Sequence, residues 1–259
     1  MITMTSDFGL KDPYVAEMKG VILTINPKAT LIDITHDIEK FNIRKAAFTL
    51  ASAVPYFPDG TVHLAVVDPG VGTQRRALVI QAKKGFFVGP DNGLLILAAQ
   101  YLGMERVYHL TNSRYMLPKV SGTFHGRDIF APAAAYLEKG VEPSEFGAEV
   151  KDPIIPAFAQ VKYSSGSLTG EVLDIDGFGN IITNIKEKDV ACREGKTVNV
   201  ELTSVSLNLL FGKAYAQAKR KEPILLIGSH GFLEIALNQA SAAEKFHVKA
   251  GDKIKVTFA

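Results

Sequence analysis

A carboxylate and a guanidinium stand on one glycine-rich stretch, where residues of these types support acid–base chemistry or bind a charged ligand. The stretch runs from Val66 to Arg76 and reads VVDPGVGTQRR, with Asp68 directly after an apolar run and Arg75 further along. An apolar run that ends at proline and glycine predicts a strand buried on both faces and a tight turn after it. Ligands of open α/β sheets bind beyond the carboxyl ends of such strands. The stretch alone leaves two interpretations open: a capped turn with a surface charge, or a charged pair that faces a ligand.

Two more polar residues occupy loops that the same sheet edge would bring near Asp68. Asp7 follows the first β-prone segment, and His125 lies in a polar loop before an alanine-rich helix predicted at Ile129–Lys139, with Asp128 as its N-cap. A lone loop histidine is more often structural than catalytic. It becomes a candidate general base only if its loop and the Asp68 loop share one sheet edge.

A histidine and several carboxylates near the second predicted strand offer a different chemistry, that of a metal-dependent hydrolase. Asp33, His36 and Asp37 lie at the end of this strand, Thr30–Ile34, and Asp7 follows the first strand. Metal sites need three or four converging ligands, and an adjacent His-Asp pair is a weak signal. The pattern favours a capped, solvated loop over a metal site, so we expect no metal.

Composition sets the class of protein. The 259 residues are 47% hydrophobic and 22% charged, as in a soluble globular protein of one large or two ordinary domains. A net charge of +2 gives no electrostatic case for binding nucleic acid or an anionic membrane. The single Cys192 forms no internal disulfide, and neither a leader peptide nor a run of membrane-spanning length is evident. We therefore expect a cytoplasmic protein.

The pattern of the chain changes near its middle. Before residue 140, short apolar runs alternate with predicted helices such as Asn42–Val54 and Leu94–Leu102, which favours an α/β sheet domain with flanking helices. Prolines and a serine-rich run then interrupt this alternation of strands and helices. Short β-prone segments follow, which favours a smaller antiparallel β-barrel. We expect an N-terminal domain at residues 1–150, a linker at 151–165 and a C-terminal domain at 166–259.

Two polar islands of the second half have the composition of a nucleoside site. One is the loop Asp176–Asn180, and the other runs from Gly228 to Ala240. Both combine glycine, an aromatic side chain and an amide, and an adenine ring needs a flat apolar surface with hydrogen bonds at its edge. Each island alone is more typical of a turn than of a binding site.

Six motifs in a fixed order are more specific than any of them singly: TSDFG, VVDPGVGTQRR, VGPDNG, GTFHGRD, DGFGNIITN and GSHGFLEIALNQASAA. In this order, and over essentially the whole chain, the sequence resembles the S-adenosylmethionine (SAM) hydroxide adenosyltransferase family, which is related to the fluorinases and chlorinases. The resemblance implies an N-terminal α/β domain joined to a C-terminal β-barrel. It also implies a homotrimer that binds SAM between the N-terminal domain of one subunit and the C-terminal domain of its neighbour.

The resemblance further implies hydrolysis of SAM to adenosine and L-methionine, without a metal and without a cofactor beyond the substrate. The catalytic positions it implies are Asp68, Arg75 and His125, and Asp7 would hold the ribose hydroxyls. The substrate-binding positions of the second domain would be Asp176, Asn180, Ser229, Asn238 and Ala240. Halide-using relatives carry a tyrosine where Asp68 stands and a serine where Gly126 stands. A protein that binds a nucleoside or SAM without turnover is the non-enzymatic alternative.

Overall fold

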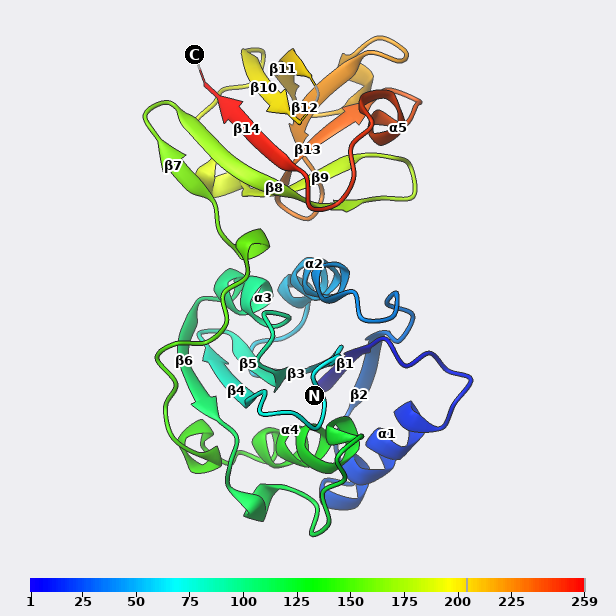
Figure 1. Cartoon of the computed structure of the whole chain (residues 1–259), viewed down its shortest axis with the longest axis vertical. Coiled ribbons are helices and arrows are strands. Elements are labelled where there is room, and N and C mark those ends of the chain that lie inside the picture. Colours follow the sequence, from blue (N-terminus) through cyan, green and yellow to red (C-terminus); the bar gives the residue numbers. More distant parts are fainter. Residues whose placement is uncertain (204, 259) are drawn as a thin grey trace. The chain divides into compact units, whose positions relative to one another are not determined.

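The chain divides into two compact units. The structure is a computed structural model, and it describes residues 1–203 and 205–258. The first unit is Met1–Ile155 and the second is Pro156–Ala259 (Figure 1).

A mixed sheet forms the centre of the first unit. Within the described residues it has six strands in the order β2-β1-β3-β5-β4-β6. Their bounds are β1 Ile2–Ser6, β2 Leu31–Thr35, β3 Thr61–Val66, β4 Ala77–Ala82, β5 Gly85–Pro90 and β6 Met104–His109. The first four strands in this order are parallel, whereas β4 runs antiparallel to both β5 and β6. Every residue of β3 is buried, which confirms the strand predicted before Asp68.

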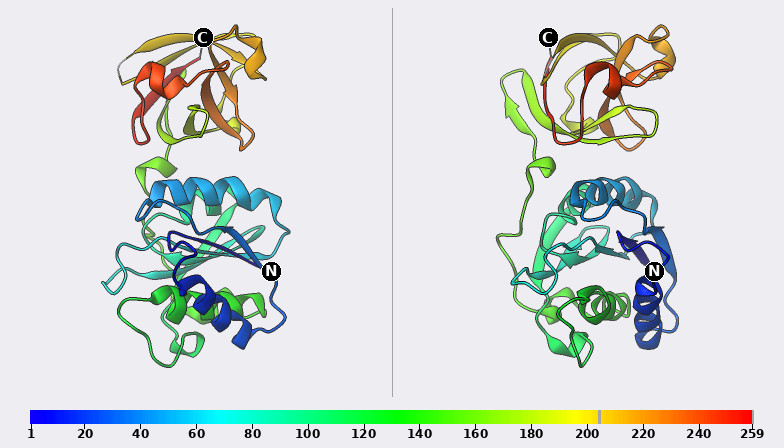
Figure 2. Two further views of the ribbon diagram at one scale, coloured as in Figure 1. Left: turned by 90° about the vertical axis from the view of Figure 1, so that its right-hand side faces the viewer. Right: turned by 45° about the vertical axis from the view of Figure 1, so that its right-hand side comes forward.

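Helices cover both faces of this sheet. They are α1 (Tyr14–Ile25), α2 (Ile43–Ala53), α3 (Ile96–Tyr101) and α4 (Ala131–Glu138). The pair α1 and α4 packs on one face and the pair α2 and α3 on the other (Figures 1 and 2). The predicted N-terminal α/β sheet domain is therefore confirmed. Short 3-10 turns also occur in this unit, at Val54–Tyr56, Ser113–Tyr115 and Pro143–Phe146.

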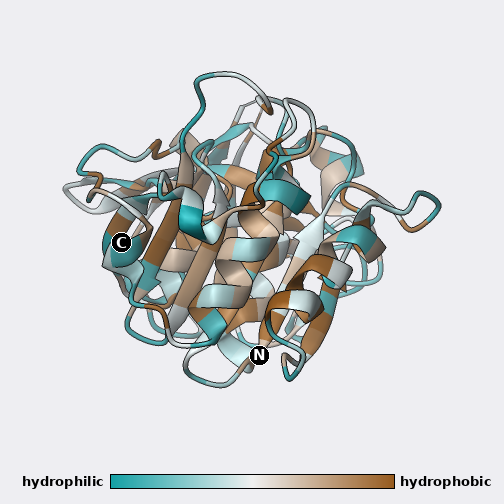
Figure 3. Ribbon diagram, turned by 90° about the horizontal axis from the view of Figure 1, so that it is seen from below, coloured by the Kyte–Doolittle hydropathy of each residue, from teal (hydrophilic) through white to brown (hydrophobic). Residues whose placement is uncertain are grey.

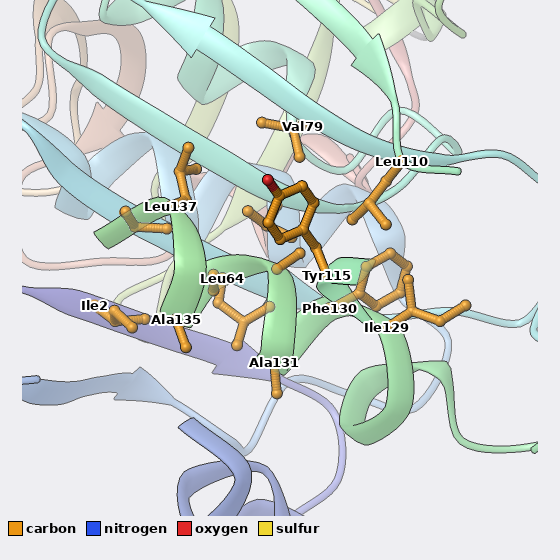
Figure 4. Packing of buried hydrophobic residues seen from close by; sticks show 14 of the residues in the cluster. Ile2, Leu64, Val79, Leu110, Tyr115, Ile129, Phe130, Ala131, Ala135 and Leu137 are labelled. Carbon is orange, nitrogen blue, oxygen red and sulfur yellow. The ribbon is translucent and has the colours of Figure 1, made fainter. Parts of the chain in front are cut away.

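Small and branched side chains fill the layer between the sheet and the α1–α4 pair. Figure 4 shows Ile2 and Leu64 from the strands beside Phe130 and the alanines of α4. These alanines are fully buried, so the helix backbone lies close to the strands. Figure 3 shows hydrophobic residues along the strands and polar residues on many outer loops. This rigid layer supports the strand ends that carry Asp7 and Asp68.

The segment before α4 differs from the prediction. A π-helical turn, Gly126–Phe130, precedes the α-helix, so Asp128 lies inside helical structure and is not an N-cap. Its buried carboxylate accepts a hydrogen bond from the backbone N–H of Ser121 at 2.8 Å and pairs with Arg127 at 2.7 Å. Asp128 thus folds the preceding loop back onto the helix, and that contact competes with capping. π-Helical turns are frequent at functional sites.

A closed β-barrel forms the second unit. Seven of its described strands follow the order β14-β10-β11-β12-β13-β9-β8, and pairing of β14 with β8 closes the ring. Their bounds are β8 Ser167–Ile175, β9 Ile181–Lys186, β10 Thr197–Leu202, β11 Ser206–Gly212, β12 Pro223–Ile227, β13 Phe232–Leu237 and β14 Lys253–Thr257. The predicted barrel is confirmed (Figure 2).

One pairing in the barrel departs from an antiparallel arrangement. β11 and β12 are parallel, because the chain between them crosses over through the turn Tyr215–Gln217 and does not form a hairpin. The short strand β7 (Lys162–Ser164) extends the sheet beside β8, and α5 (Ala242–Phe246) follows β13. Further 3-10 turns lie at Ala157–Ala159 and Glu187–Asp189. No helix among residues 1–203 and 205–258 is long and apolar enough to cross a bilayer.

Candidate active site

The order of strands places Asp7 and Asp68 at one edge of the first sheet. From β1 the chain passes through α1 to β2 on one side, and it then returns through α2 to β3 on the other side. The carboxyl ends of β1 and β3 therefore form a switch point of the kind where α/β proteins bind ligands. A cavity of about 370 Å³ lies here, and Asp7, Asp68 and His125 all line it.

Arg75 joins the two loops that carry Asp68 and His125. Its Nε donates to Asp68 Oδ1 at 3.1 Å and its Nη2 donates to Asp68 Oδ2 at 2.6 Å. The same Nη2 lies 2.9 Å from His125 Nδ1. The side chains of Asp68 and Arg75 are only 5% and 7% exposed, and the guanidinium also lies over the ring of Phe130. The structure thus brings together the three residues predicted as a triad, which we call the Asp68–Arg75–His125 cluster.

The contact with Arg75 defines the protonation of His125. Since a guanidinium can only donate, His125 Nδ1 accepts, and in the neutral ring the proton resides on Nε2. Burial, and then the positive charge of Arg75, lower the pKa of His125 below its ordinary 6.5. At neutral pH the cluster therefore contains a neutral imidazole that offers an N–H and a carboxylate that can accept a proton.

Backbone contact between the two loops depends on glycine. Gly72 has a φ of +76°, and a Cβ built on it would lie 2.1 Å from the carbonyl oxygen of Gly122. No atom lies within 4 Å of a Cβ built on Gly122 itself. A side chain at residue 72 would therefore push the loops apart, whereas one at residue 122 would meet open space.

We expect Gly72→Ala to separate Arg75 from His125 and to raise the pKa of His125 toward its ordinary value. The cause is removal of the nearby positive charge and partial hydration of the ring. An NMR titration of the histidine ring protons measures the change. Gly122→Ala is the matched control and should leave the pKa where it is in the wild type. Equal titration curves for all three proteins would contradict this role of Gly72.

Aromatic side chains that were not predicted as site residues form a wall of the same cavity. Phe8, Tyr14 and Phe124 lie edge to face or tilted, with ring centroids 5.1 to 5.9 Å apart. Phe41 also lines the cavity, although it is 68% exposed and has a φ of 64°. Its backbone N–H donates to Asp7 Oδ2 at 2.9 Å. A local signal existed only for Phe8 and Phe124, which stand within the TSDFG and GTFHGRD motifs.

The loop Pro90–Gly93, which belongs to the VGPDNG motif, packs beside the segment that carries Asp68. Asp91 is 2% exposed, pairs with Arg76 at 2.7 Å and accepts from the backbone of Ile154. Asn92 Nδ2 donates to the carbonyl of Val67 at 2.8 Å. The Asn92 contact holds the chain immediately before Asp68, whereas Asp91 ties the loop to Arg76 and Ile154. None of the loop's residues lines the cavity.

The alternative metal site finds no support in the geometry. Among the described residues, no group of three or more His, Cys, Asp or Glu side chains converges on a point that would suit a metal. The expectation that His36 lies in a solvated loop is wrong, because the residue is 4% exposed. Its ring packs behind the Asp7 loop and lies against Ser6 and Asp33.

The second unit has a cavity of its own, of about 720 Å³. All five site residues predicted for this domain line it: Asp176, Asn180, Ser229, Asn238 and Ala240. Asp176 also shapes the loop, since its Oδ1 accepts from the backbone of Phe178 and Asn180, and its Oδ2 accepts from Asn180 Nδ2. Phe178 is 83% exposed beside this opening. An aromatic and an amide side chain of this loop thus both line the cavity.

A buried acid beneath this cavity was not predicted. Glu234 is 6% exposed and accepts a hydrogen bond at 2.8 Å from the hydroxyl of Tyr215, which lines the cavity. Burial, opposed by this hydrogen bond and reinforced by the charge of Asp176, raises the pKa of Glu234. In the sequence Glu234 lies within the polar island Gly228–Ala240, which alone is more typical of a turn, whereas the structure places it in the buried strand β13 (Phe232–Leu237).

The fold and these cavities define a two-domain protein, an α/β unit followed by a β-barrel, with a carboxylate–arginine–histidine cluster at the sheet edge. The chain belongs to the SAM hydroxide adenosyltransferase family. Residues 2–147 match the SAM hydroxide adenosyltransferase N-terminal domain, and residues 170–255 match the SAM hydroxide adenosyltransferase C-terminal domain.

Relatives of known name cover almost the entire chain. An (R)-S-adenosyl-L-methionine hydrolase of Thermus thermophilus is 40% identical over 97% of this chain and 97% of its own length. That of Methanocaldococcus jannaschii is 38% identical over 100% and 96%. A fluorinase of Actinoplanes sp. is 28% identical over 99% and 97%. A solved structure of an uncharacterized conserved protein from Thermotoga maritima has a TM-score of 0.85 and 38% identity, and covers 100% of both chains.

Proposed function

We propose that this protein hydrolyses SAM to adenosine and L-methionine, with water attacking the ribose C5′ atom in line with the sulfonium sulfur. The C5′–O bond forms as the C5′–S bond breaks, the bonding electrons leave with sulfur, and the water releases one proton. The observation that carries the proposal is the bridge from Arg75 to both Asp68 and His125 in a cavity that also contains Asp7. Hydrolase names of relatives at 38% and 40% identity support the same reaction.

Asp68 is the proposed acceptor of the proton of water. His125 does not suit this role in its neutral form, because Arg75 occupies Nδ1 and the proton resides on Nε2. Arg75 binds both oxygens of Asp68 and so fixes the direction of their remaining lone pairs. In this assignment Asp68 polarises the water, and the N–H of His125 orients it.

The oxygen of water attacks C5′ of a sulfonium cation while the Asp68 carboxylate accepts a proton, so the two opposite charges are neutralised as the reaction proceeds. In this proposal SAM bound against the aromatic walls displaces bulk water, which strengthens the attraction between the carboxylate and the sulfonium and removes hydration that opposes it. Alignment of the water with C5′ adds to this effect, and positioning of this kind can lower a barrier by ~7 kcal/mol or more. The proposed mechanism needs no metal and no further cofactor.

Two residues favour water over halide as the nucleophile. A halide near the Asp68 carboxylate would be repelled by roughly 4 kcal/mol at a separation of ~4 Å and an intermediate effective dielectric. Space is also short at Gly126, because a Cβ there would lie 3.1 Å from Phe124 Cε2 and 3.3 Å from Met18 Sδ. A serine at this position would therefore require the aromatic wall to move.

We further propose a homotrimer in which the barrel of a neighbouring subunit completes each site. The two sets of predicted residues support it, since one cavity carries the groups for water and ribose while the other carries Asp176 and Asn180 for the methionine or the base. Mixing inactive Asp68→Asn subunits with inactive Asn180→Ala subunits tests this, because some sites would then combine two intact halves. Activity should return after the subunits exchange, and no return would contradict shared sites.

Incubation of the purified protein with SAM, followed by chromatography, tests the function. We expect adenosine and L-methionine in equal amounts, with and without EDTA. The two sulfonium epimers are assayed separately, and we expect the (R) epimer to react faster, since the names of the hydrolase relatives specify it. Loss of activity with EDTA and recovery with a divalent ion would favour a metal-dependent hydrolase. Intact SAM retained by the protein over hours would favour a binding protein.

A further inference from the structure

Behind the cavity of the first unit, a row of polar side chains joins the ends of β1 and β2. Ser6 Oγ lies 2.7 Å from His36 Nδ1, and His36 Nε2 lies 3.1 Å from Asp33 Oδ1, although not in hydrogen-bond alignment. Lys19 of α1 donates to Asp33 Oδ2 at 2.6 Å. This row, Ser6–His36–Asp33–Lys19, links a helix to the residue immediately before Asp7.

The row is buried where it meets the Asp7 loop. Ser6 is 1% exposed and His36 is 4% exposed, whereas the outer pair of Lys19 and Asp33 is partly open to solvent. Burial alone would raise the pKa of Asp33, but the hydrogen bond and charge of Lys19, together with the nearby His36 ring, hold it below its ordinary value. The outer end of the row is therefore the Lys19–Asp33 ion pair, and the buried end consists of the Ser6 hydroxyl and the His36 ring.

Backbone hydrogen bonds tie the same segments together around Asp7. The N–H of Gly9 donates to the carbonyl of His36 at 2.8 Å, and the N–H of Ile38 lies 3.4 Å from the carbonyl of Ser6. The N–H of Phe8 donates to Ser6 Oγ at 3.3 Å. The backbone before and after Asp7 is thus hydrogen-bonded to the segment around His36. These bonds restrict the positions that the Asp7 carboxylate can take.

The order serine, histidine, aspartate is also that of a hydrolytic triad, but the surroundings of Ser6 argue against a nucleophile. Its hydroxyl is buried and is shared between His36 and the backbone of Phe8. Neither Ser6 nor His36 lines the cavity, whereas Asp7 does. The row can therefore act on a ligand only through the residue it holds.

We infer that Ser6 and His36 are positioning residues that orient the Asp7 carboxylate toward the ribose hydroxyls of the ligand. The inference rests on the proposed function for its ligand, and it adds a determinant of selectivity for a ribose over a deoxyribose. Asp7 accepts hydrogen bonds from the hydroxyls, and His36 and Ser6 determine how well its carboxylate is aligned for them. A carboxylate displaced from hydrogen-bond distance or alignment bonds the hydroxyls more weakly, so the selectivity for ribose falls.

The test measures nucleoside selectivity and not turnover. Calorimetry gives the Kd of adenosine and of 2′-deoxyadenosine for each protein, and the ratio of the two reports on the ribose contact. The wild type should prefer adenosine by about 10-fold or more, as expected for a site built to bond a hydroxyl. Asp7→Asn should remove most of this preference and defines the full effect.

Substitutions of His36 separate its two contacts. His36→Asn retains a polar atom near Nδ1, which faces Ser6, and should retain the preference. His36→Gln retains one near Nε2, which faces Asp33, and should lower the preference at least about threefold, as should Ser6→Ala. Asp37→Asn is the matched control, because Asp37 is the exposed neighbour of His36 in the same segment.

The outcomes are distinct. Loss of preference in His36→Gln and Ser6→Ala, with the Kd of 2′-deoxyadenosine unchanged, supports the inference. An equal rise of the Kd for both nucleosides would show a merely structural role, and two unchanged Kd values would show no role. Either result overturns the inference. A wild type that does not distinguish the nucleosides also overturns it. Failure of the proposed function is seen separately, as absence of SAM turnover in a protein that still selects adenosine.

Discussion

Replacement of Asp68 by asparagine should lower kcat for adenosine formation at least ~100-fold and leave the affinity for adenosine within about threefold of the wild type. An amide has nearly the shape of the carboxylate, so Arg75 keeps an oxygen to bond, but the amide cannot accept the proton of water. The loss is therefore expected in kcat and not in binding. Single-turnover rates and calorimetry with adenosine measure the two quantities.

A second buried pair provides the control for Asp68. Asp91 and Arg76 form an ion pair at 2.7 Å in the neighbouring loop, and the Asp91 side chain is 2% exposed. Asp91→Asn removes a buried carboxylate charge of the same kind outside the cavity, so its loss of fold stability should be similar to that of Asp68→Asn. We expect its kcat to change by less than about threefold. Equal turnover in Asp68→Asn and wild type would remove Asp68 from the mechanism.

Substitution of His125 by alanine should also lower kcat at least ~100-fold, and it should abolish the pH dependence that this residue imposes. Neutral His125 accepts a hydrogen bond from Arg75, but a protonated ring would place an N–H against the guanidinium. Turnover of the wild type should therefore be constant from pH 7 to pH 8 and fall as the pH drops through the lowered pKa of His125, below 6.5.

The free energy of unfolding should change with pH in the same direction as turnover. Because the folded pKa of His125 lies below its ordinary 6.5, the unfolded chain takes up a proton first as the pH falls. Its contribution to the free energy of unfolding is thus complete above pH 6.5 and diminishes below it. Rates from pH 5 to 8, compared with an NMR titration of the ring, test the assignment. A ring that titrates above pH 6.5, or an unchanged acid limb in His125→Ala, would contradict it.

Much of the fold could be predicted from local patterns. The run Val62–Val67 is apolar at nearly every position, which occurs in strands buried on both faces, and its end at Asp68 marks the ligand edge of the sheet. The proline-rich segment and the short β-prone runs after it indicated a second, barrel-like unit. Six ordered motifs indicated the family and the residues that line both cavities.

Features that depend on distant contacts could not be predicted in the same way. Asp128 has the sequence of a helix cap, yet the backbone of Ser121 and the side chain of Arg127 draw it into a π-helical turn. His36 has the sequence of a solvated loop, yet packing of β1 beside β2 buries it against Ser6. In both cases tertiary hydrogen bonds override the local structural preference of the sequence, and no residue spacing along the chain predicts these bonds.

Gly72 shows why local sequence patterns do not reveal how the cluster assembles, although the resemblance to the family implied its three residues. The motif VVDPGVG is typical of a turn, and only the structure reveals that Gly72 lies directly against the carbonyl of Gly122. That contact brings Arg75 within 2.9 Å of His125, fifty positions along the chain. The chemical groups could be proposed separately, but their meeting depends on a backbone approach that no local pattern encodes.

Hydrolysis in ¹⁸O-labelled water tests the central claim, that water attacks C5′ of SAM, most directly. Mass spectrometry of the products locates the label. In-line attack at C5′ predicts one ¹⁸O atom in the 5′-hydroxyl of adenosine and none in methionine, with formation of the labelled adenosine lost in Asp68→Asn. Unlabelled adenosine, or 5′-methylthioadenosine and homoserine lactone as the products, would contradict the claim.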